Sequence, residues 1–350
     1  TEQWNVGLDF SVFDSRIKLT ADWYLKNTRD LLLEATMPSS SGYTTAMMNV
    51  GSMQNQGVEV TLDLVPVQRK NFTWNMNFNI AMNRNKVTAL TNDQYSLLRS
   101  ISWDQTFNSQ YPYITQVGKP SGLMYGFIYE GTYKKSDFEN GALKKEIASL
   151  STVQRDKIAP GDPKYRDVNR DGIVDDNDRT VIGCGQPLHT GGFGNTFNFY
   201  GFDVNVFFSW SYGNDILNAN RLYFESGLKK HTNQLKSYVN RWREEKNENS
   251  DIPRVNANGM SVYSSRVIED GSFLRLRNIT IGYTLPRKTL RKMHFDTMRV
   301  YVSGENLWTL TGYSGPDPEV STKNSVLTPG FDWSAYPRAM GVTAGLSFTF

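Results

Sequence analysis

One stretch of the sequence combines residue types and spacing that suit metal chemistry. Residues 167–178 read Asp-Val-Asn-Arg-Asp-Gly-Ile-Val-Asp-Asp-Asn-Asp. Oxygen-bearing side chains stand at positions 1, 3, 5, 9 and 12 with glycine at position 6, which is EF-hand spacing with Asp as the last residue. The spacing predicts a structural Ca²⁺ site with these ligands: Asp167, Asn169, Asp171, Ile173 through its carbonyl, Asp175 directly or through water, and Asp178.

A metal-free loop is the alternative interpretation of the same stretch. Asp, Asn and Gly form turns that are held by hydrogen bonds between their side chains and nearby backbone groups. Five side-chain oxygens in register exceed what such a turn needs, so a hard cation is favoured. In either case we expect Gly172 to permit a sharp turn and Val174 to point inward as an apolar anchor.

The rest of the sequence offers little catalytic chemistry. His189, His231 and His294 lie far apart with no ligand spacing, and Cys184 is a lone thiol. The sequence lacks the Gly-x-Ser-x-Gly, His-Glu-x-x-His and phosphate-loop patterns. None of the Asp/Glu pairs can be recognised as a glycosidase pair without geometry. We therefore expect no enzyme, and we interpret the basic run 287–292 as a solvated turn, the alternative being contact with partner proteins or lipid headgroups.

Charge and hydropathy exclude further classes of protein. Lys plus Arg number 38 and Asp plus Glu 35, a net charge of +3, which is too balanced for nucleic-acid binding. No apolar run approaches the roughly 18 residues of a membrane helix. Residues 1–5 have no signal-peptide pattern, and a strand-like alternation follows at once. We therefore expect the chain to be a piece of something longer.

The elements that position these residues are long strands. Apolar and polar residues alternate in runs of about ten to thirteen residues, the length of a tilted membrane-crossing strand, whereas ordinary strands average nearer five or six. The clearest runs are 4–12, 17–25, 58–64, 72–82, 190–200, 202–213, 272–285, 298–309 and 340–350. The pattern predicts an all-β fold, a transmembrane antiparallel β-barrel.

The connections alternate between very short and very long, as in outer-membrane barrels with short periplasmic turns and long external loops. Counting up and down from both ends requires two more strands, for which 111–118 and 121–134 are the candidates, giving about eleven. Loop 135–189 would carry the Ca²⁺ site outside the membrane, and loop 214–271 shows rough helical spacing over 214–246. Thr1 would lie at the external rim.

Two arginines conflict with a simple strand over 272–285. Arg275 and Arg277 share the phase of Ile279 and Ile281, and an arginine facing lipid at mid-bilayer costs about 2–4 kcal/mol. Either a bulge switches the phase or both arginines lie near the external rim.

Several segments, in order along the whole chain, resemble the C-terminal barrel of SusC/RagA-type TonB-dependent transporters. They are 5–10 (NVGLDF), 30–33 (DLLL), 49–51 (NVG), 55–59 (NQGVE), 273–278 (FLRLRN), 304–309 (GENLWT) and 315–319 (GPDPE). The resemblance implies a 22-stranded barrel in the outer membrane of a Gram-negative bacterium, of which this chain supplies the last eleven strands. The plug domain and the first half of the barrel would lie outside the chain.

The resemblance also implies a function and partners. These are active import of a nutrient, either a glycan or an oligopeptide, with a SusD-like lipoprotein as external lid and TonB acting through the absent N-terminal region. The partners would include the remaining N-terminal barrel and plug, and outer-membrane lipid, but no nucleic acid.

The alternative function is a non-transporting surface protein that binds glycans or adheres and uses the calcium loop structurally. Strand length and the terminal alternation of Leu346, Phe348 and Phe350 favour the barrel. External aromatic residues are candidates for substrate contact or for loop cores, and no individual one is assigned to either role: Tyr43, Trp103, Phe107, Tyr111, Tyr223, Phe224, Tyr263, Trp333 and Tyr336.

Overall fold

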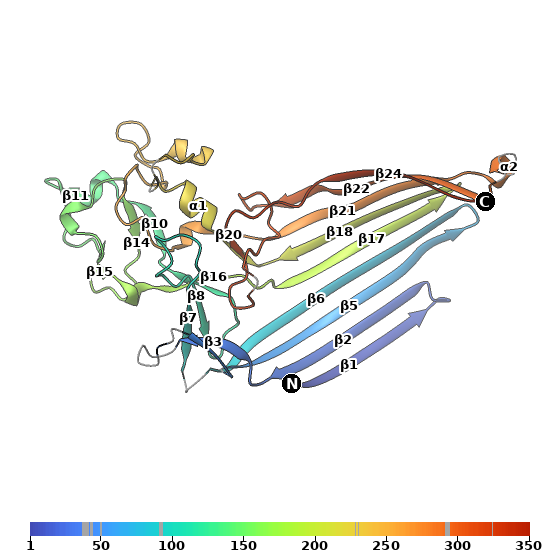
Figure 1. Ribbon diagram of the computed structural model, residues 1–350, viewed down its shortest axis with the longest axis horizontal. Coiled ribbons are helices and arrows are strands. Elements are labelled where there is room, and N and C mark those ends of the chain that lie inside the picture. Colours follow the sequence, from blue (N-terminus) through green and yellow to red (C-terminus); the bar gives the residue numbers. More distant parts are fainter. Residues whose placement is uncertain are drawn as a thin grey trace.

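The chain folds into a sheet of long strands and a globular region at one end of that sheet (Figure 1). The computed structural model describes residues 1–36, 42, 45–49, 51–90, 94–227, 229, 231–290, 295–323 and 325–350. No helix among these residues is both long enough and apolar enough to cross a membrane.

The sheet contains nine strands, and every neighbouring pair is antiparallel. In spatial order they are β1 (Glu2–Val12), β2 (Ile17–Thr28), β5 (Gly51–Arg69), β6 (Phe72–Leu90), β17 (His189–Phe199), β18 (Phe202–Tyr212), β21 (Phe273–Thr284), β22 (Thr297–Thr311) and β24 (Gly341–Thr349). Within the described part of the chain, β1 and β24 each pair on one side only, so the sheet is open.

The pairing register places apolar residues opposite one another across the whole sheet. Val6 stands opposite Trp23, Trp23 opposite Val58, and Val58 opposite Met82. The same face continues through β21 and β22, where Ile281 pairs with Val302, to the edge strand β24, where Val302 pairs with Ala344. Because side chains alternate between faces along a strand, the opposite face collects the Asp, Asn, Thr and Gly residues. The sheet therefore has one apolar face and one polar face, as a barrel wall between lipid and an aqueous lumen requires.

One polar residue on the apolar face has its own partner. Asn195 of β17 pairs in register with Met76 of β6 and with Val206 of β18. The indole Nε1 of Trp74 donates a hydrogen bond to the Asn195 side-chain oxygen over 3.0 Å. The amide is therefore satisfied within the wall, which removes most of the cost of placing it among apolar groups.

At the end of the sheet away from the globular region, tight turns join β1 to β2, β5 to β6 and β17 to β18, whereas the connection from β21 to β22 includes the short helix α2 (Arg287–Leu290). Tyr200 and Gly201, which link β17 to β18, both have positive φ, at 46° and 88°. Two successive residues of positive φ are the signature of a type I′ hairpin turn, whose twist matches that of the strands. Long excursions leave the sheet only at its other end (Figure 1).

The two candidate strands at 111–118 and 121–134 do not belong to this sheet, so the wall formed by the described residues has nine strands, not eleven. They break into β8 (Tyr113–Gln116), β9 (Leu123–Gly126) and β10 (Tyr129–Thr132). β8 and β9 lie in a separate sheet of order β16-β9-β8-β7, whose outer strands are β16 (Thr180–Cys184) and β7 (Ser96–Arg99). β6 pairs directly with β17. Consecutive residues of β8 are buried, whereas a wall strand buries alternate residues against other parts of the protein.

The globular region is built from three excursions of the chain. The first lies between β6 and β17, the second between β18 and β21, and the third between β22 and β24. The core of the globular region includes Phe107, Met124, Leu217 and Phe331, each 0% exposed. The remaining strands are β3 (Leu32–Thr36), β4 (Thr45–Asn49), β7 (Ser96–Arg99), β11 (Phe138–Glu139), β12 (Ala142–Leu143), β13 (Ser149–Leu150), β14 (Pro163–Tyr165), β15 (Ile173–Val174), β16 (Thr180–Cys184), β19 (Asp215–Asn218), β20 (Ile268–Asp270) and β23 (Phe331–Asp332).

Helices in the described residues are short. α1 (Ala219–Phe224) and the 3₁₀ helix η6 (Lys236–Asn240) lie within 214–246, where the sequence predicts short helices. The others are η3 (Lys135–Asp137), η4 (Arg155–Lys157), η5 (Asp176–Asp178), η7 (Ser265–Val267) and α2 (Arg287–Leu290). At the root of the first excursion, Arg84 of β6 donates to the Leu188 carbonyl over 2.7 Å.

A β-bulge resolves the phase of the two arginines. Leu276 and Asn278 pair with successive residues of β18, which leaves Arg277 as the extra residue. Leu276 therefore joins the apolar face, opposite Trp308 of β22, and Arg275 moves to the polar face. A bulge inserts one residue in one strand only, so every side chain beyond it changes face.

Carboxylates from the third excursion neutralise both arginines. The Arg275 side chain is 3% exposed and donates to Asp317, and its second guanidinium nitrogen lies 3.4 Å from Glu319. Arg277 donates to the same Glu319 carboxylate over 2.6 Å, and Arg338 donates to it over 2.9 Å. The excursion 312–340 therefore folds back over the polar face and is tied to it by charge.

A charge placed at the middle of β18 should reduce stability by different amounts on the two faces of the sheet. Val206→Arg, on the apolar face, should lower the unfolding free energy of the whole protein in lipid bilayers by about 2–4 kcal/mol. Asn205→Arg, on the polar face, is the matched control and should cost less than half as much. Denaturant titrations in vesicles measure both. Equal costs would contradict the assignment of the faces.

The ion pair between Arg275 and Asp317 predicts that the stability of residues 312–340 depends on pH. Burial alone would raise the pKa of Asp317, but hydrogen bonds from Arg275 and from the backbone N–H groups of Glu319 and Arg338 outweigh it and lower that pKa below its usual value. A carboxylate whose pKa is lowered by folding stabilises the fold at neutral pH, and that stabilisation is lost as the pH falls through the folded pKa.

Asp317→Asn should therefore destabilise residues 312–340 at pH 7 by about 1–3 kcal/mol, since a buried charge loses its matched acceptor. The difference from the parent should shrink as the pH falls below the usual carboxyl pKa of about 4. Hydrogen exchange of this segment against pH measures it, with the exposed Asp296→Asn as control. A difference that stays constant with pH would refute the role of this carboxylate.

Candidate functional site

The predicted calcium loop lies in the first excursion, between β14 and β16. Its residues Ile173 and Val174 form β15, which pairs in parallel with Ser149 and Leu150 of β13. Val174 is 0% exposed and packs with Leu150, Phe127 and Tyr165. The inward anchor predicted from the sequence is confirmed. Gly172 has φ of +90°, so the sharp turn predicted there is also confirmed.

Side-chain oxygens of the loop accept hydrogen bonds from its own backbone. Asp167 accepts from the N–H of Gly172 over 2.8 Å, and Asn169 accepts from Asp171 over 2.9 Å. Asp171 in turn accepts from Ile173 over 2.9 Å, and Asp175 accepts from Asn177 over 2.8 Å. Each side chain thus fixes the peptide two to five residues further on, and the predicted ligand oxygens are held on one compact loop.

Asp178 closes the loop. It is 0% exposed, and its carboxylate accepts from the backbone N–H groups of Val168, Asn169 and Asp175 at 2.7, 3.2 and 2.8 Å. Residues at the two ends of the loop are therefore bound to one carboxylate. Such multiple acceptance compensates for burial of the charge.

The donor set suits a hard cation, because carboxylate and carbonyl oxygens are what Ca²⁺ takes. Each ionised carboxylate offers about four acceptor sites, so hydrogen bonding to the backbone leaves lone pairs available. Among the described residues, however, no group of three or more His, Cys, Asp or Glu side chains is arranged to hold a metal ion. Calcium binding therefore stays a prediction.

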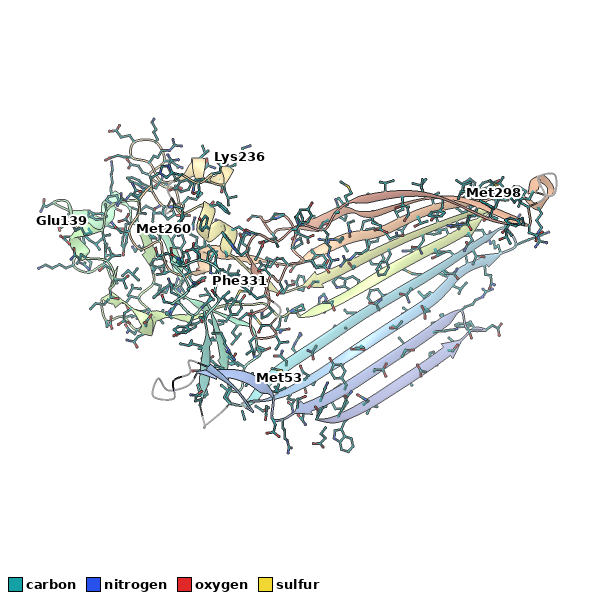
Figure 2. All side chains as sticks on the ribbon, in the orientation of Figure 1. Met53, Glu139, Lys236, Met260, Met298 and Phe331 are labelled. Atoms are coloured by element: carbon teal, nitrogen blue, oxygen red, sulfur yellow. The ribbon has the colours of Figure 1, made fainter. Side chains whose placement is uncertain are left out.

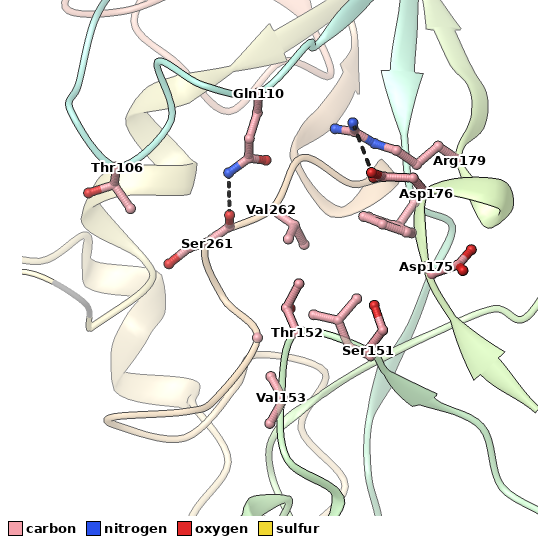
Figure 3. A pocket seen from close by; sticks show the side chains of 13 residues that line it. Thr106, Gln110, Ser151, Thr152, Val153, Asp175, Asp176, Arg179, Ser261 and Val262 are labelled. Atoms are coloured by element: carbon pink, nitrogen blue, oxygen red, sulfur yellow. Dashed lines mark hydrogen bonds and ion pairs between the residues drawn. The ribbon is translucent and has the colours of Figure 1, made fainter.

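A cavity of about 600 Å³ borders this loop (Figure 3). Its walls come from residues 106–110, Phe127, 150–153 and 175–179 of the first excursion and from 259–262 of the second. The Arg179 guanidinium lies 3.6 Å from the Asp176 carboxylate on one side, and Gln110 donates to the Ser261 carbonyl on another. The cavity therefore lies where the two longest excursions meet.

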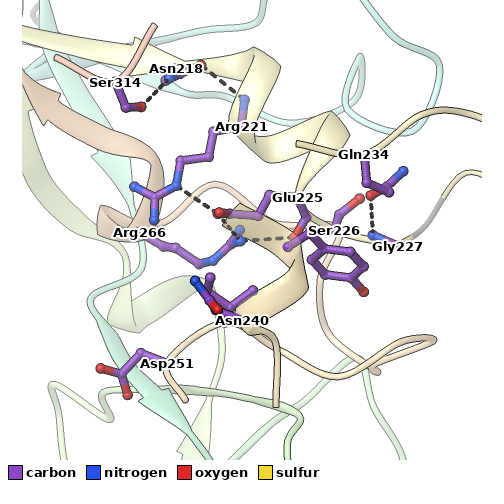
Figure 4. Close-up of polar contacts among 12 residues, drawn as sticks. Asn218, Arg221, Glu225, Ser226, Gly227, Gln234, Asn240, Asp251, Arg266 and Ser314 are labelled. Atoms are coloured by element: carbon purple, nitrogen blue, oxygen red, sulfur yellow. Dashed lines mark hydrogen bonds and ion pairs between the residues drawn. The ribbon is translucent and has the colours of Figure 1, made fainter. Parts of the chain in front are cut away.

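A buried ion network holds together distant parts of the second excursion (Figure 4). Glu225 follows α1 and its side chain is 1% exposed. It accepts from Arg266, itself 5% exposed, over 2.6 Å and from Arg221 over 2.7 Å. Arg221 also lies 3.5 Å from Glu269. Burying these charges costs several kcal/mol per ion, so the network specifies one arrangement of α1 and is costly to break.

The candidate aromatic residues fall into two groups. Phe107 and Tyr263 are 0% exposed and belong to the core of the globular region. Trp103 packs on Trp333 with ring centroids 4.6 Å apart, and Phe224 stacks on Trp333 at 5.9 Å. Tyr223 joins the same cluster.

The cluster is therefore a packed junction of three excursions. Tyr111 and Tyr336 are exposed, at 42% and 93%, and Tyr43 lies outside the described residues.

The remaining sequence candidates lie apart from one another. His189 stacks on Tyr212 and accepts a hydrogen bond from the Trp210 indole, so it belongs to the wall. His294 lies outside the described residues, and Cys184 is partly buried at the end of β16. Sequence reasoning missed Arg179 and the Glu225–Arg266 pair, because isolated charges in polar loops carry no spacing signal.

The whole length of the chain is similar to known receptors. No family model matches the chain. It is 34% identical to TonB-dependent receptor P3 of Formosa agariphila over 100% of the chain and 34% of that receptor. It is 28% identical to TonB-dependent receptor SusC of Bacteroides thetaiotaomicron over 100% of the chain and 32% of that receptor. The chain thus spans about a third of the length of the curated relatives it matches.

The fold agrees with these sequence similarities. The structure of the RagAB peptide transporter matches 99% of the chain with a TM-score of 0.77 and 25% identity, and the chain covers 35% of that structure. By sequence over its whole length and by fold, the chain is therefore similar to the SusC/RagA type of TonB-dependent receptors, which are β-barrel proteins of the Gram-negative outer membrane.

Proposed function

We propose that the protein containing this chain imports a nutrient across the outer membrane, driven by TonB. The observation that carries the proposal is the nine-stranded sheet whose apolar and polar faces stay in register from β1 to β24. Such a wall separates lipid from an aqueous path, and its similarity to TonB-dependent receptors extends over the full chain.

The proposal includes an external lid and a polymeric substrate. The excursions gather at one end of the sheet and form a folded platform with exposed Tyr336 and Val239. This platform would receive a SusD-like lipoprotein, and the substrate would be a glycan or an oligopeptide. The relative named as a peptide transporter supports the second choice, and the relative named SusC supports the assignment of the receptor type.

Energised import predicts two separable results in cells that carry this receptor as their only route for a labelled glycan or oligopeptide mixture. Collapse of the proton gradient should reduce uptake to background and leave surface binding unchanged. Uptake of a small solute through a porin in the same cells is the control. Uptake that persists without the gradient would refute TonB coupling. Surface binding without uptake in energised cells would favour a non-transporting surface protein.

We further propose that residues 167–178 bind Ca²⁺ with a structural role, stiffening the first excursion beneath the lid. The ligands would be Asp167, Asn169, Asp171, Asp178, the Ile173 carbonyl and Asp175. Four carboxylates repel one another within so short a loop, and a divalent cation removes that repulsion. The backbone contacts of Asp178 support this proposal because they already join the two ends of the loop.

Calcium should bind at about 10⁻⁴–10⁻³ M, as in extracellular modules. It should slow hydrogen exchange over 167–178 in the parent. Asp171→Ala should weaken binding more than tenfold and abolish this protection, whereas Asp156→Ala, an exposed carboxylate of the same excursion, should leave both unchanged. Calorimetry with the whole receptor after chelator treatment measures the affinity. Equal exchange of the parent with and without Ca²⁺ would rule the site out.

A further inference from the structure

The cavity at the junction of the two long excursions has the size of a small-molecule site. It measures about 600 Å³, within the range of about 300–1,000 Å³ that small-ligand pockets occupy. Its lining belongs to the globular region, outside the nine-stranded wall, so a ligand there would not lie in the lumen-facing surface of the sheet.

Arg179 is the feature that points to a ligand. Its side chain is only 9% exposed, and its guanidinium carbon lies 5.4 Å from the ring centroid of Tyr125 and 5.5 Å from that of Phe127. Among the described residues its Nε has no hydrogen-bond partner. A buried donor without an acceptor costs about 1–3 kcal/mol, so the hydrogen-bonding capacity of this guanidinium is not used up within the protein.

The charges around Arg179 define the chemistry of that molecule. The only cation lining the described cavity is this guanidinium, and it already faces Asp176 at 3.6 Å, with Asp175 also in the lining. Two carboxylates against one guanidinium disfavour an anion. A guanidinium beside a carboxylate instead offers donors and acceptors side by side, which suits neighbouring hydroxyl groups that both donate and accept.

The rest of the lining is uncharged and of two kinds. Hydroxyl and amide groups come from Thr106, Gln110, Ser151, Thr152 and Ser261, and apolar surface comes from Phe127, Leu150, Val153 and Val262. Figure 3 shows Gln110, Thr152 and Val262 around one space, with the Arg179–Asp176 pair at its edge. A ligand with many hydroxyls and an apolar ring face matches this mixture.

We propose that this cavity binds a small uncharged polyhydroxylated molecule, a monosaccharide or disaccharide, through the Arg179–Asp176 pair. A short peptide is the competing occupant, but its amides and terminal charges match vicinal-hydroxyl recognition less well. The proposal does not rest on transport, because binding in the cavity needs no gradient.

Binding to the whole detergent-purified receptor tests the proposal. The probes are D-glucose, D-galactose, D-mannose and maltose, with Ala-Ala and sodium acetate as the peptide and anion probes, measured by saturation-transfer NMR and titration. At least one sugar should bind the parent. Arg179→Met, which keeps the side chain's apolar length, and Thr152→Trp, which fills the cavity, should each weaken that binding at least tenfold.

The matched control is Arg166→Met, since Arg166 is an exposed arginine of the same excursion that pairs with Glu130 outside the cavity. It should bind the sugar as the parent does. If Arg179→Met fails to fold, as judged by the loss of heat-dependent mobility in gel electrophoresis, the result with Thr152→Trp decides whether the proposal holds. Sugar binding that survives the cavity-filling variant would overturn the proposal. Absence of sugar binding to the parent, or preferential binding of Ala-Ala or acetate, would do so equally.

Discussion

Hydrocarbon offers no hydrogen-bond partners, so every backbone N–H and C=O group in a membrane wall must be paired within the protein. Within the described residues, the nine-stranded sheet meets this constraint by antiparallel pairing between neighbours from β1 to β24, and the outer edges of β1 and β24 are open. Pairing also fixes the register, and the register fixes which side chains face lipid. A shift of one residue in any strand would exchange its two faces. The alternation read from the sequence is the side-chain consequence of this backbone requirement.

The same constraint explains why irregular structure gathers at one end. The bulge at Arg277 is placed toward that end of β21, where it turns Arg275 to the polar face. There Asp317 and Glu319 of the third excursion meet the arginines. The wall thus ends in charged groups that are paired with each other, and the excursion carrying the carboxylates becomes part of the lining.

The wall strands could be predicted because one local pattern determines them. Val58, Val60 and Leu62 alternate with Glu59 and Thr61, and no distant residue is needed to interpret that pattern. The segment at 113–116 was misassigned because Tyr113 and Ile114 form a short strand that is buried on both faces, which local alternation does not distinguish from a wall strand. For Arg275 the sequence predicts either a bulge or a position near the rim. Only the pairing partners on β18 and β22 show that the strand contains a bulge.

The site was predictable only where its residues are adjacent in sequence. Gly172 and Val174 follow from the spacing of the loop, because their roles are set within twelve residues. Arg179, by contrast, acquires its surroundings from Tyr125 and from segments as distant as 259–262. Such a cavity exists only once the excursions have packed, and no sequence spacing encodes it.

The direct pairing of β6 with β17 has a consequence for how the chain assembles. These neighbours are separated by the longest excursion of the chain. Because the entropic cost of closing a loop grows with the logarithm of its length, closing this loop costs about 3 kcal/mol more than closing a two-residue turn. Contacts at the root offset that cost: Arg84 binds the Leu188 carbonyl, and Val87 exchanges backbone hydrogen bonds with Gly118 and Lys119. An excursion that folds before the wall brings β17 to the edge of β6, so we expect the rate of wall assembly to depend on the folding of the globular region.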